Sequence, residues 1–341
     1  MRTLSLFAFV IGIELYAYQA LATIFPGSSI LPIIYFSITA ILIAAVLLFV
    51  NAGLKKRVNL PRGVLTGTFF MLFIPKLFTA ILLLGEDIVR LGKTLAMGIV
   101  HVAGNESFYL GTERSLVWSI ISVSIAGLLS LSFVYGALFN VYNYKVRKVN
   151  VKLMKLPKAF DGLKVVQISD IHSGSLTDKA AVQKAVEKIN SLHPDVIFFT
   201  GDLVNNLATE AVSFVDVFKH LQAPHGVYSV LGNHDYGDYA AWPSEESKQN
   251  NLNMLKKIHG EMGWRLLLNE HVKIEKDGEK IVVAGVENWS ASGRFHSYGK
   301  LDAALHGIQD AITVLLLSHD PSHWEAEILK HPAHVDLTFS G

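Results

Sequence analysis

Polar side chains that can bind metal ions or move protons follow four separate apolar runs, VVQIS, VIFFTG, VYSVLG and TVLLLS. In chain order these residues are Asp170, His172, Asp202, Asn233, His234, Asp235 and His319. Carboxylate, imidazole and amide groups are costly to place at the end of a buried strand unless something binds them. In α/β sheets, ligands bind in the crevice beyond the carboxyl ends of the strands, so we expect these side chains to converge there.

The residue types fit a two-metal centre. Two divalent ions roughly 3.5–4 Å apart can clamp an in-line displacement at phosphorus, and Asp202 is placed centrally for the carboxylate that bridges them. Asp170 and His172 are two residues apart, so extended backbone would project both toward one ion. Asn233 offers an amide oxygen to the other ion, and His319 offers an imidazole. Oxygen and imidazole donors suit Mn, Fe or Zn.

His234 and Asp235 have the residue types of a proton-transfer pair. His234 follows a predicted ligand directly and is free to donate a proton or a hydrogen bond to a phosphate. Asp235 is expected to orient the His234 imidazole, as carboxylates commonly do for catalytic histidines.

The second half of the chain must position these residues. From about Val149, apolar runs of strand length alternate with helical patterns, which predicts an α/β fold. Strands are predicted within LKVVQISD, DVIFFTGD, GVYSVLGNHD, KIVVAGVENW, AITVLLLSHD and HVDLTFSG. Helices are predicted at 178–192, 210–221 and 245–262. His259 lies in the last of these helices and is expected at the surface.

The first half of the chain is strongly apolar. Segments 4–25, 28–50, 64–84 and 116–142 are each long enough to cross a bilayer, which takes roughly 20 residues. The first segment resembles a cleavable signal peptide, but a second apolar run follows Pro26 and Gly27 at once, which favours an uncleaved helical hairpin.

Two features of the apolar half concern charged and amphipathic segments. Glu14 and Lys76 fall within the predicted spans, where ionisable groups either serve function or pair with each other. Segment 85–111 is weakly amphipathic and is expected to lie along the outer membrane interface.

Charge and composition indicate the orientation in the membrane and exclude some kinds of site. The basic residues beside the predicted spans are Lys55, Lys56, Arg57, Arg62, Lys145, Arg147 and Lys148. By the positive-inside rule, these residues predict that both termini and the second half are cytoplasmic. The net charge of +1 gives no sign of a nucleic-acid surface, and the absence of cysteine excludes disulfides and thiolate metal sites.

The elements DIH, GDLVN, GNHD and SHDP, in this order, resemble the calcineurin-like metallophosphoesterases. GLKVVQISDIHSG and GVYSVLGNHDYG resemble the bacterial membrane-associated phosphodiesterase-like branch of that family. The resemblance covers about 149–341 and implies two β-sheets sandwiched by helices (α-β-β-α). It implies one metal on Asp170, His172 and Asp202, and a second on Asp202, Asn233 and His319. It makes His234 the phosphoryl contact and a metal-bridging water or hydroxide the nucleophile.

The family pattern also sets expectations around the predicted ligands. After DLTFSG it continues with a motif such as HTHGGQ, whose histidines complete both metal shells. Because this sequence stops at Gly341, we expect a truncated chain with weakened metal binding. Asn205 is expected to stabilise its own loop rather than bind metal.

Two further segments are candidates for substrate contact. Asn288 and Arg294 follow a predicted strand, and Arg294 can form a charge-assisted hydrogen bond to phosphate. The alternative is a structured loop with Trp289 packed against the core. The aromatic residues of segment 235–242 either form one wall of the pocket or cap the next helix.

The expected architecture is an N-terminal α-helical transmembrane bundle at 1–148 and a C-terminal α/β metallophosphoesterase domain at 149–341. The expected protein is an integral hydrolase of the bacterial plasma membrane, with two divalent ions (Mn, Fe or Zn) as cofactors and its catalytic domain in the cytoplasm. Its expected substrate is a phosphoester, for which the hypothesis is a lipid-linked or envelope-precursor compound, and no nucleic-acid partner is expected. The alternatives are a non-catalytic membrane sensor or scaffold that retains the fold, and a transporter or channel with a regulatory domain.

Overall fold

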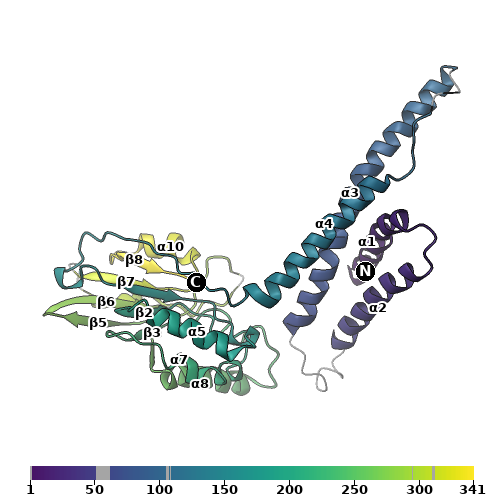
Figure 1. Ribbon diagram of the computed structural model, residues 1–341. Helices are drawn as coiled ribbons and strands as arrows, with labels where there is room; N and C mark the ends of the chain where they lie inside the picture. The colour runs from purple at the N-terminus through teal and green to yellow at the C-terminus, as the bar shows by residue number, and fades with distance from the viewer. Residues whose placement is uncertain (1, 51–61, 105–106, 108, 294, 309–311) are drawn as a thin grey trace. The chain divides into compact units, whose positions relative to one another are not determined.

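The computed structural model describes residues 2–50, 62–104, 107, 109–293, 295–308 and 312–341. Contacts between residues divide the chain into two compact units, Met1–Asn143 and Tyr144–Gly341. The first unit is helical, and the second contains all the described strands (Figure 1).

The helical unit contains four long helices. They are α1 (Arg2–Ile24), α2 (Ile30–Val50), α3 (Arg62–Val102) and α4 (Leu116–Tyr135), and a short π-helix at Gly136–Asn140 continues α4. Within the described residues, Gly67–Val102 and Leu116–Tyr135 are long and apolar enough to cross a membrane, and shorter apolar helices lie at Ala8–Ile24 and Ile30–Ile41. Segment 85–111 was expected to lie along the outer membrane interface, but most of it belongs to α3, which continues unbroken to Val102.

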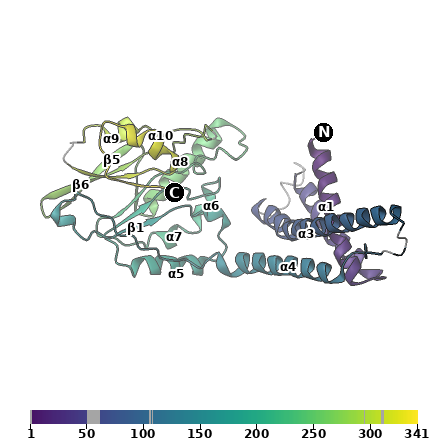
Figure 2. The same ribbon diagram turned by 90° about the horizontal axis from the view of Figure 1, so that it is seen from above.

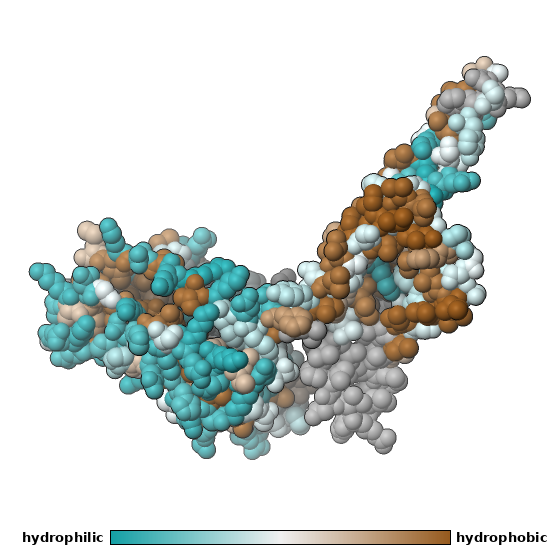
Figure 3. All heavy atoms as spheres, in the orientation of Figure 1, coloured by the Kyte–Doolittle hydropathy of each residue, from teal (hydrophilic) through white to brown (hydrophobic). Residues whose placement is uncertain are grey.

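The surface of this unit is apolar. Large hydrophobic side chains that are at least half exposed occur on each of α1–α4, for example Phe9, Ile33, Ile81 and Leu128. Figure 3 shows these apolar side chains gathered over the helices. A surface of this kind is stable in lipid but not in water, in agreement with the predicted membrane bundle.

The two charged residues within the predicted spans pair with each other. Lys76 Nζ lies 2.8 Å from Glu14 Oε2 and 2.7 Å from Thr39 Oγ1, and Thr39 donates a second hydrogen bond to Glu14. Lys76 also lies over the ring of Tyr35. The network joins α1, α2 and α3, so the structure supports the structural alternative for this pair of charges.

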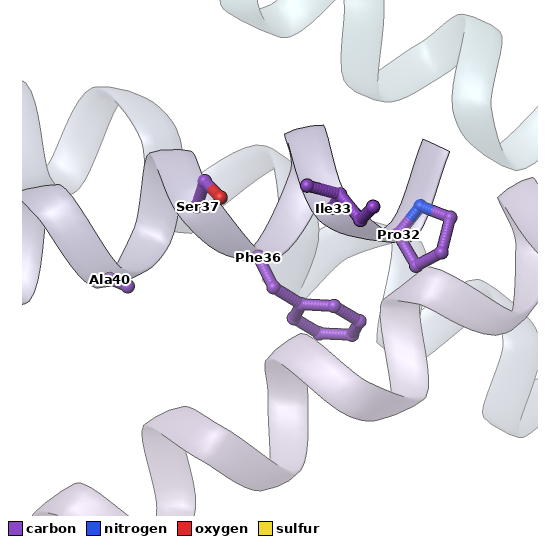
Figure 4. Close-up of a pocket in the computed structure, with 5 residues that line it drawn as sticks. All are labelled: Pro32, Ile33, Phe36, Ser37 and Ala40. Carbon is purple, nitrogen blue, oxygen red and sulfur yellow. The ribbon is translucent and has the colours of Figure 1, made fainter. Parts of the chain in front are cut away.

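A shallow hollow on α2 is lined by Pro32, Ile33, Phe36, Ser37 and Ala40 (Figure 4). All five residues belong to one helix, and only Ser37 has a polar side chain. The hollow therefore has no group capable of acid–base or metal chemistry.

The second unit contains eight strands. They are β1 (Val165–Ile168), β2 (Val196–Phe199), β3 (Val227–Ser229), β4 (Trp264–Leu266), β5 (Glu270–Lys276), β6 (Glu279–Gly285), β7 (Thr313–Leu317) and β8 (Leu337–Phe339). Its α-helices are α5 (Lys179–Asn190), α6 (Thr209–Val212), α7 (Val215–Phe218), α8 (Glu245–Glu261), α9 (Leu301–Leu305) and α10 (Ser322–Ala326), with 3-10 turns at Lys158–Phe160, Ser173–Ser175 and Ile328–Lys330.

The strands form two four-stranded sheets. One has the order β1-β2-β3-β4 and is parallel throughout. The other has the order β5-β6-β7-β8, in which only the β5–β6 pair is antiparallel. Figures 1 and 2 show α5 and α7 on one side of the unit and α10 on the other. This is the predicted arrangement of two sheets between helices.

The main core lies between the two sheets. Phe198 and Val230, from the β2–β3 part of the first sheet, belong to the same buried cluster as Val283 and Leu315 of the second. All four residues of β2 are buried, as expected for a central strand covered on both faces. Because apolar contacts hold the sheets face to face, the loops at their carboxyl ends are brought to one edge.

Three details differ from the sequence prediction. The helix predicted at 210–221 is broken into two short helices, α6 and α7, around Ser213 and Phe214. The short strand β4 and the hairpin strand β5 were not predicted. His259 was expected at the surface, but it is fully buried against Phe199 and Trp264.

We expect His259→Gln to make stability less sensitive to acid. Burial lowers the pKa of His259 to about 3, whereas an unfolded histidine titrates near 6.5. Below pH 6.5 the unfolded chain binds a proton that the folded chain does not, so His259 destabilises the wild type by about 2 kcal/mol at pH 5 relative to pH 8. Urea unfolding in detergent, followed by tryptophan fluorescence at both pH values, measures this difference.

The exposed His220 provides the matched control. His220→Gln should leave the pH dependence as in the wild type. An equal response of the two variants would contradict the role assigned to His259.

Candidate metal centre

The predicted polar residues lie beyond the carboxyl ends of β1, β2, β3 and β7. The loops after β1 and β2 run side by side, because Asp170 N–H donates to the Gly201 carbonyl and His172 N–H donates to the Asp202 carbonyl, both at 3.0 Å. In the second sheet, Ser318 N–H donates to the Phe339 carbonyl, which fixes the start of the loop that carries His319. Both sheets therefore contribute side chains to one site.

Three of the predicted ligands form a close group of donors. Asp170, Asp202 and His319 each offer an atom that lies within 4.8 Å of the other two. His172 joins the group, since its Nε2 lies 3.5 Å from Asp202 Oδ2 and 3.8 Å from Asp170 Oδ1. Asn233 is present as well, with Oδ1 3.2 Å from His319 Nε2. The structure thus brings together all five residues predicted as ligands.

Asp202 lies at the centre of this group. Its Oδ2 is 3.5 Å from His172 Nε2 on one side and 3.4 Å from His319 Nε2 on the other, while Oδ1 accepts the His234 N–H at 2.9 Å. Burial raises the pKa of Asp202, but the contact with His319 and the His234 amide outweigh burial and lower it. Asp202 is therefore a carboxylate with one oxygen directed between two imidazoles.

His319 has one ring nitrogen anchored and one directed into the site. Its Nδ1 lies 2.8 Å from the Thr200 carbonyl, which can only accept a hydrogen bond, so Nδ1 carries the proton and Nε2 is the donor atom. Metal-bound histidines generally have this anchor on a backbone carbonyl or carboxylate. Burial lowers the pKa of His319, but the nearby Asp202 carboxylate raises it to about 9. Since a metal ligand must be neutral, metal uptake must displace this proton.

Tyr239 fixes the orientation of Asn233. The Asn233 Nδ2 donates to the Tyr239 hydroxyl at 2.8 Å, which leaves Oδ1 facing His319. The Tyr239 ring also contacts the His234 ring, with centroids 4.6 Å apart. Tyr239 lies within the aromatic segment considered as a pocket wall, but nothing in the sequence indicated this hydrogen bond.

The backbone at three predicted ligands is left-handed. Asp170, His172 and Asp202 have φ of 52°, 45° and 62°, a region that costs energy for residues other than glycine and is enriched at functional sites. Asp170 and His172 were predicted to point the same way because of extended backbone. That reason is wrong, although both side chains reach the same group of donors.

Two glycines permit the loops after β2 and β3 to approach closely. A Cβ on Gly232 would lie 2.2 Å from Asp202 Oδ1, and a Cβ on Gly201 would lie 2.5 Å from the Gly232 nitrogen. Gly201 also has φ of 103°. Any side chain at Gly232 would therefore displace the central carboxylate.

Asp235 has a different position from the one predicted. Its fully buried carboxylate accepts hydrogen bonds from the Gly232 and Asp202 amides at 2.9 Å, and from the Leu203 and Val204 amides at 2.9 and 3.2 Å. Burial and the charge of Asp202 raise its pKa to about 7, while the amides act in the opposite direction. The expectation that Asp235 orients the His234 imidazole is wrong, because this carboxylate instead holds the two loops together.

The Asn205 carbonyl takes the place predicted for Asp235. His234 Nδ1 lies 2.7 Å from that carbonyl, so Nδ1 donates and Nε2 remains for a ligand. The His234 ring also meets the His172 ring edge-on, with centroids 4.9 Å apart. The Asn205 side chain bonds to Ser175, in keeping with a role in its own loop.

The two candidate substrate residues are not both described. Asn288 is almost fully buried, and its Nδ2 donates to the His296 carbonyl at 3.1 Å. This favours the structured-loop alternative for that segment, in which Trp289 stacks on the buried His323 ring. Arg294 lies outside the described residues.

The donor set fits divalent metal ions. Separations of 3.2–3.8 Å between neighbouring donors are those produced by roughly 2.0–2.2 Å bonds to a shared ion. The donors are carboxylate, amide and imidazole groups, which suit Mn, Fe or Zn rather than a thiolate-binding metal. The left-handed backbone and the anchored His319 ring both hold donors in position before any ion binds.

Asp235→Asn should loosen both loops. The amide keeps the shape of the side chain but presents N–H groups to backbone N–H groups, so we expect a loss of about 2–4 kcal/mol in the free energy of unfolding and weaker Mn²⁺ binding. Urea unfolding and titration calorimetry of the protein in detergent measure the two effects. Asp216→Asn, at an exposed ion pair with Lys179, should leave the free energy of unfolding close to that of the wild type. Similar losses in both variants would refute the anchoring role.

Tyr239→Phe should weaken metal binding without unfolding the protein. The variant retains the ring against His234 but removes the hydroxyl that holds the Asn233 amide, and loss of such an orienting partner typically costs about 10-fold or more in metal affinity. Tyr228→Phe, on β3 beside Phe198, is the control and should bind Mn²⁺ as the wild type does. Unchanged affinity in Tyr239→Phe would show that Asn233 needs no such support.

Comparison with known families matches both units. Residues 1–141 match the family model "Probable Calcineurin-like phosphoesterase, transmembrane domain", and residues 163–341 match "Calcineurin-like phosphoesterase". The second match covers more than half of the chain and includes every predicted metal ligand.

Relatives with similar sequences are also phosphoesterases by name. A "Transmembrane protein with metallophosphoesterase domain" from Danio rerio is 28% identical over 259 residues, which is 74% of this chain and 54% of that protein. An uncharacterized metallophosphoesterase from Helicobacter pylori is 30% identical over 58% of this chain and 48% of its own length. The UDP-2,3-diacylglucosamine pyrophosphatase LpxG from Chlamydia trachomatis is 40% identical over 98 residues, 28% of this chain and 30% of that protein.

The chain spans about half the length of the first two of these relatives. The motifs, the paired sheets with their group of metal donors, and the match over both units agree. The chain belongs to the calcineurin-like phosphoesterase family, with a transmembrane helical domain preceding the metallophosphoesterase domain.

Proposed function

We propose that the protein is a membrane-anchored phosphoester hydrolase that depends on two divalent metal ions. The observation that carries the proposal is the position of Asp202 Oδ2, 3.5 and 3.4 Å from the imidazoles of His172 and His319. Asp170, His172 and Asp202 would hold one ion, and Asp202, Asn233 and His319 would hold the other. Asp202 is then the shared ligand.

Bound divalent ions at this site would polarise a phosphoryl oxygen and supply a nucleophile from water at neutral pH. The chain itself supplies the arrangement around them. Because His234 Nδ1–H donates to the Asn205 carbonyl, Nε2 can donate to a phosphoryl or leaving oxygen only when the ring carries protons on both nitrogens. His234 is thus proposed to stabilise or protonate the leaving oxygen in its cationic form.

The helical unit is proposed to anchor the catalytic unit at the membrane. We place the anchor at 1–148 and the hydrolase domain at 149–341. The basic residues between the second and third spans and after the fourth favour a cytoplasmic position for the hydrolase domain. Anchoring keeps the site near the bilayer and favours substrates that reside there.

The proposed substrate class is a lipid-linked or envelope-precursor phosphoester. Membrane attachment supports this class, and the name of LpxG from Chlamydia trachomatis describes a pyrophosphatase of a diacylated sugar nucleotide. Both points bear on which substrate the protein meets, and neither bears on how the phosphoester bond is cleaved. The class is therefore tested separately from hydrolysis itself.

Hydrolysis is tested with the full-length protein in detergent, given Mn, Fe, Zn or Mg. We expect metal-dependent cleavage of a chromogenic phosphodiester or phosphomonoester by the wild type. Asp202→Asn should reduce kcat by at least about 1,000-fold, because the variant loses the shared carboxylate between the two ions. Comparable turnover by the variant would refute the bridging role, and inactivity of the wild type with every metal would favour the non-catalytic alternative.

The substrate class is tested on the same preparation. A diacylated sugar nucleotide in mixed micelles is compared with an unacylated sugar nucleotide, each over a range of concentrations. A kcat/KM for the acylated compound at least 10-fold higher would support a lipid-linked substrate. Equal values for the two compounds would count against it while leaving the hydrolase assignment intact.

A further inference from the structure

Helix α3 is much longer than a bilayer requires. Its 41 residues rise about 60 Å, roughly twice the thickness of the hydrocarbon core. A polar network marks where the bundle ends: Arg114 lies 3.0 Å from Glu86 and 2.9 Å from Asp87, and α4 begins two residues later. Figure 1 shows α3 continuing past the start of α4. The part of α3 from about Ile88 to Val102 therefore projects beyond the helical bundle.

One face of this projecting helix is apolar and exposed. It continues a stripe that begins in the bundle and consists of Ile81, Leu84, Ile88, Leu91, Leu95, Ile99 and Val102, which are between 54% and 91% exposed. Successive members are three or four residues apart, so they lie on one side of the helix. Below the polar network lipid can cover the stripe, whereas beyond it the same face would meet water.

The opposite face is covered by the returning chain. Arg90 Nε donates to the Thr112 carbonyl at 2.6 Å, Lys93 Nζ donates to the Gly111 carbonyl at 3.3 Å, and the Leu110 amide donates to the Met97 sulfur. These contacts pin the chain that leads into α4 against that side. Among the described residues, nothing covers the apolar stripe.

The stripe has the heptad pattern of a two-stranded coiled coil. Ile81, Ile88, Leu95 and Val102 occupy one position of the heptad, and Leu84, Leu91 and Gly98 occupy the other. β-branched residues at the first core position with leucine at the second favour parallel dimers. Gly85 and Gly92 flank the seam, and a Cβ at either position would meet nothing within 4 Å, so a partner helix has room to approach.

We propose that the projecting half of α3 pairs with the same segment of a second copy, as a parallel two-stranded coiled coil. Copies inserted in one membrane share one orientation, which supplies the parallel arrangement. Because α3 has no proline after Pro75 and continues from the spanning part without a break, the projecting half does not bend back toward the bilayer. The pairing depends on neither the metal site nor hydrolysis.

The chain contains no cysteine, so single introduced cysteines report contacts directly. Leu91→Cys and Leu95→Cys test the seam, and Lys93→Cys is the matched control on the opposite face. Each full-length variant is oxidised with copper–phenanthroline in native membranes and separated by non-reducing electrophoresis. We expect products of twice the chain mass at Leu91 and Leu95, with at least tenfold lower yield at Lys93.

A second measurement keeps the proposal independent of cysteine chemistry. The mass of the wild type in lipid nanodiscs should be that of two chains, and Leu91→Lys with Leu95→Lys should halve it, whereas Lys93→Ala should not. Equal crosslinking at all three positions, products of another mass, or a monomeric wild type would overturn the proposal. Of these, a monomer with uniformly low crosslinking would point to a lipid-covered helix instead.

Discussion

The buried carboxyl group of Asp235 is the contact on which the metallophosphoesterase domain depends. It accepts four backbone N–H groups, one from the loop after β3 and three from the loop after β2. Those two loops carry Asn233 and Asp202, so their separation sets where both side chains point. A buried carboxyl group that satisfies several backbone amides is a strong constraint, because each amide left without its acceptor would be costly. The position of the central oxygen of the candidate metal centre thus follows from a group that is directed away from that centre.

Glycine and left-handed backbone make this close approach possible. Gly232 leaves space for the Asp202 carboxylate, and Asp170, His172 and Asp202 adopt backbone angles that few side chains tolerate. These backbone conformations are energetically unfavourable, and the packing of the buried strands beneath the loops offsets their cost. The loops that carry Asp170, His172 and Asp202 can keep this strained backbone only because the two-sheet core beneath them is rigid.

The sequence predicted the elements and the site composition well, because both are local. Apolar runs of strand length mark the strands, and the six predicted runs correspond to β1, β2, β3, β6, β7 and β8. Four of these runs, at β1, β2, β3 and β7, are followed by the Asp, His and Asn residues of the site. The contacts of Asp235, the Tyr239–Asn233 hydrogen bond and the anchor of His319 on Thr200 could not be predicted, because they join loops or use backbone groups. His259 was misplaced because a helical pattern does not show which polar residue faces the core.

The Glu14–Lys76–Thr39 network has a consequence for how the membrane domain is assembled. Glu14 lies on α1, which is synthesised before α3, and its cationic partner Lys76 comes 62 residues later in the chain. A lone carboxylate in hydrocarbon is costly, so the release of α1 alone into lipid is unfavourable until Lys76 of α3 can pair with Glu14. The order of synthesis therefore favours concerted entry of these helices over one-by-one insertion.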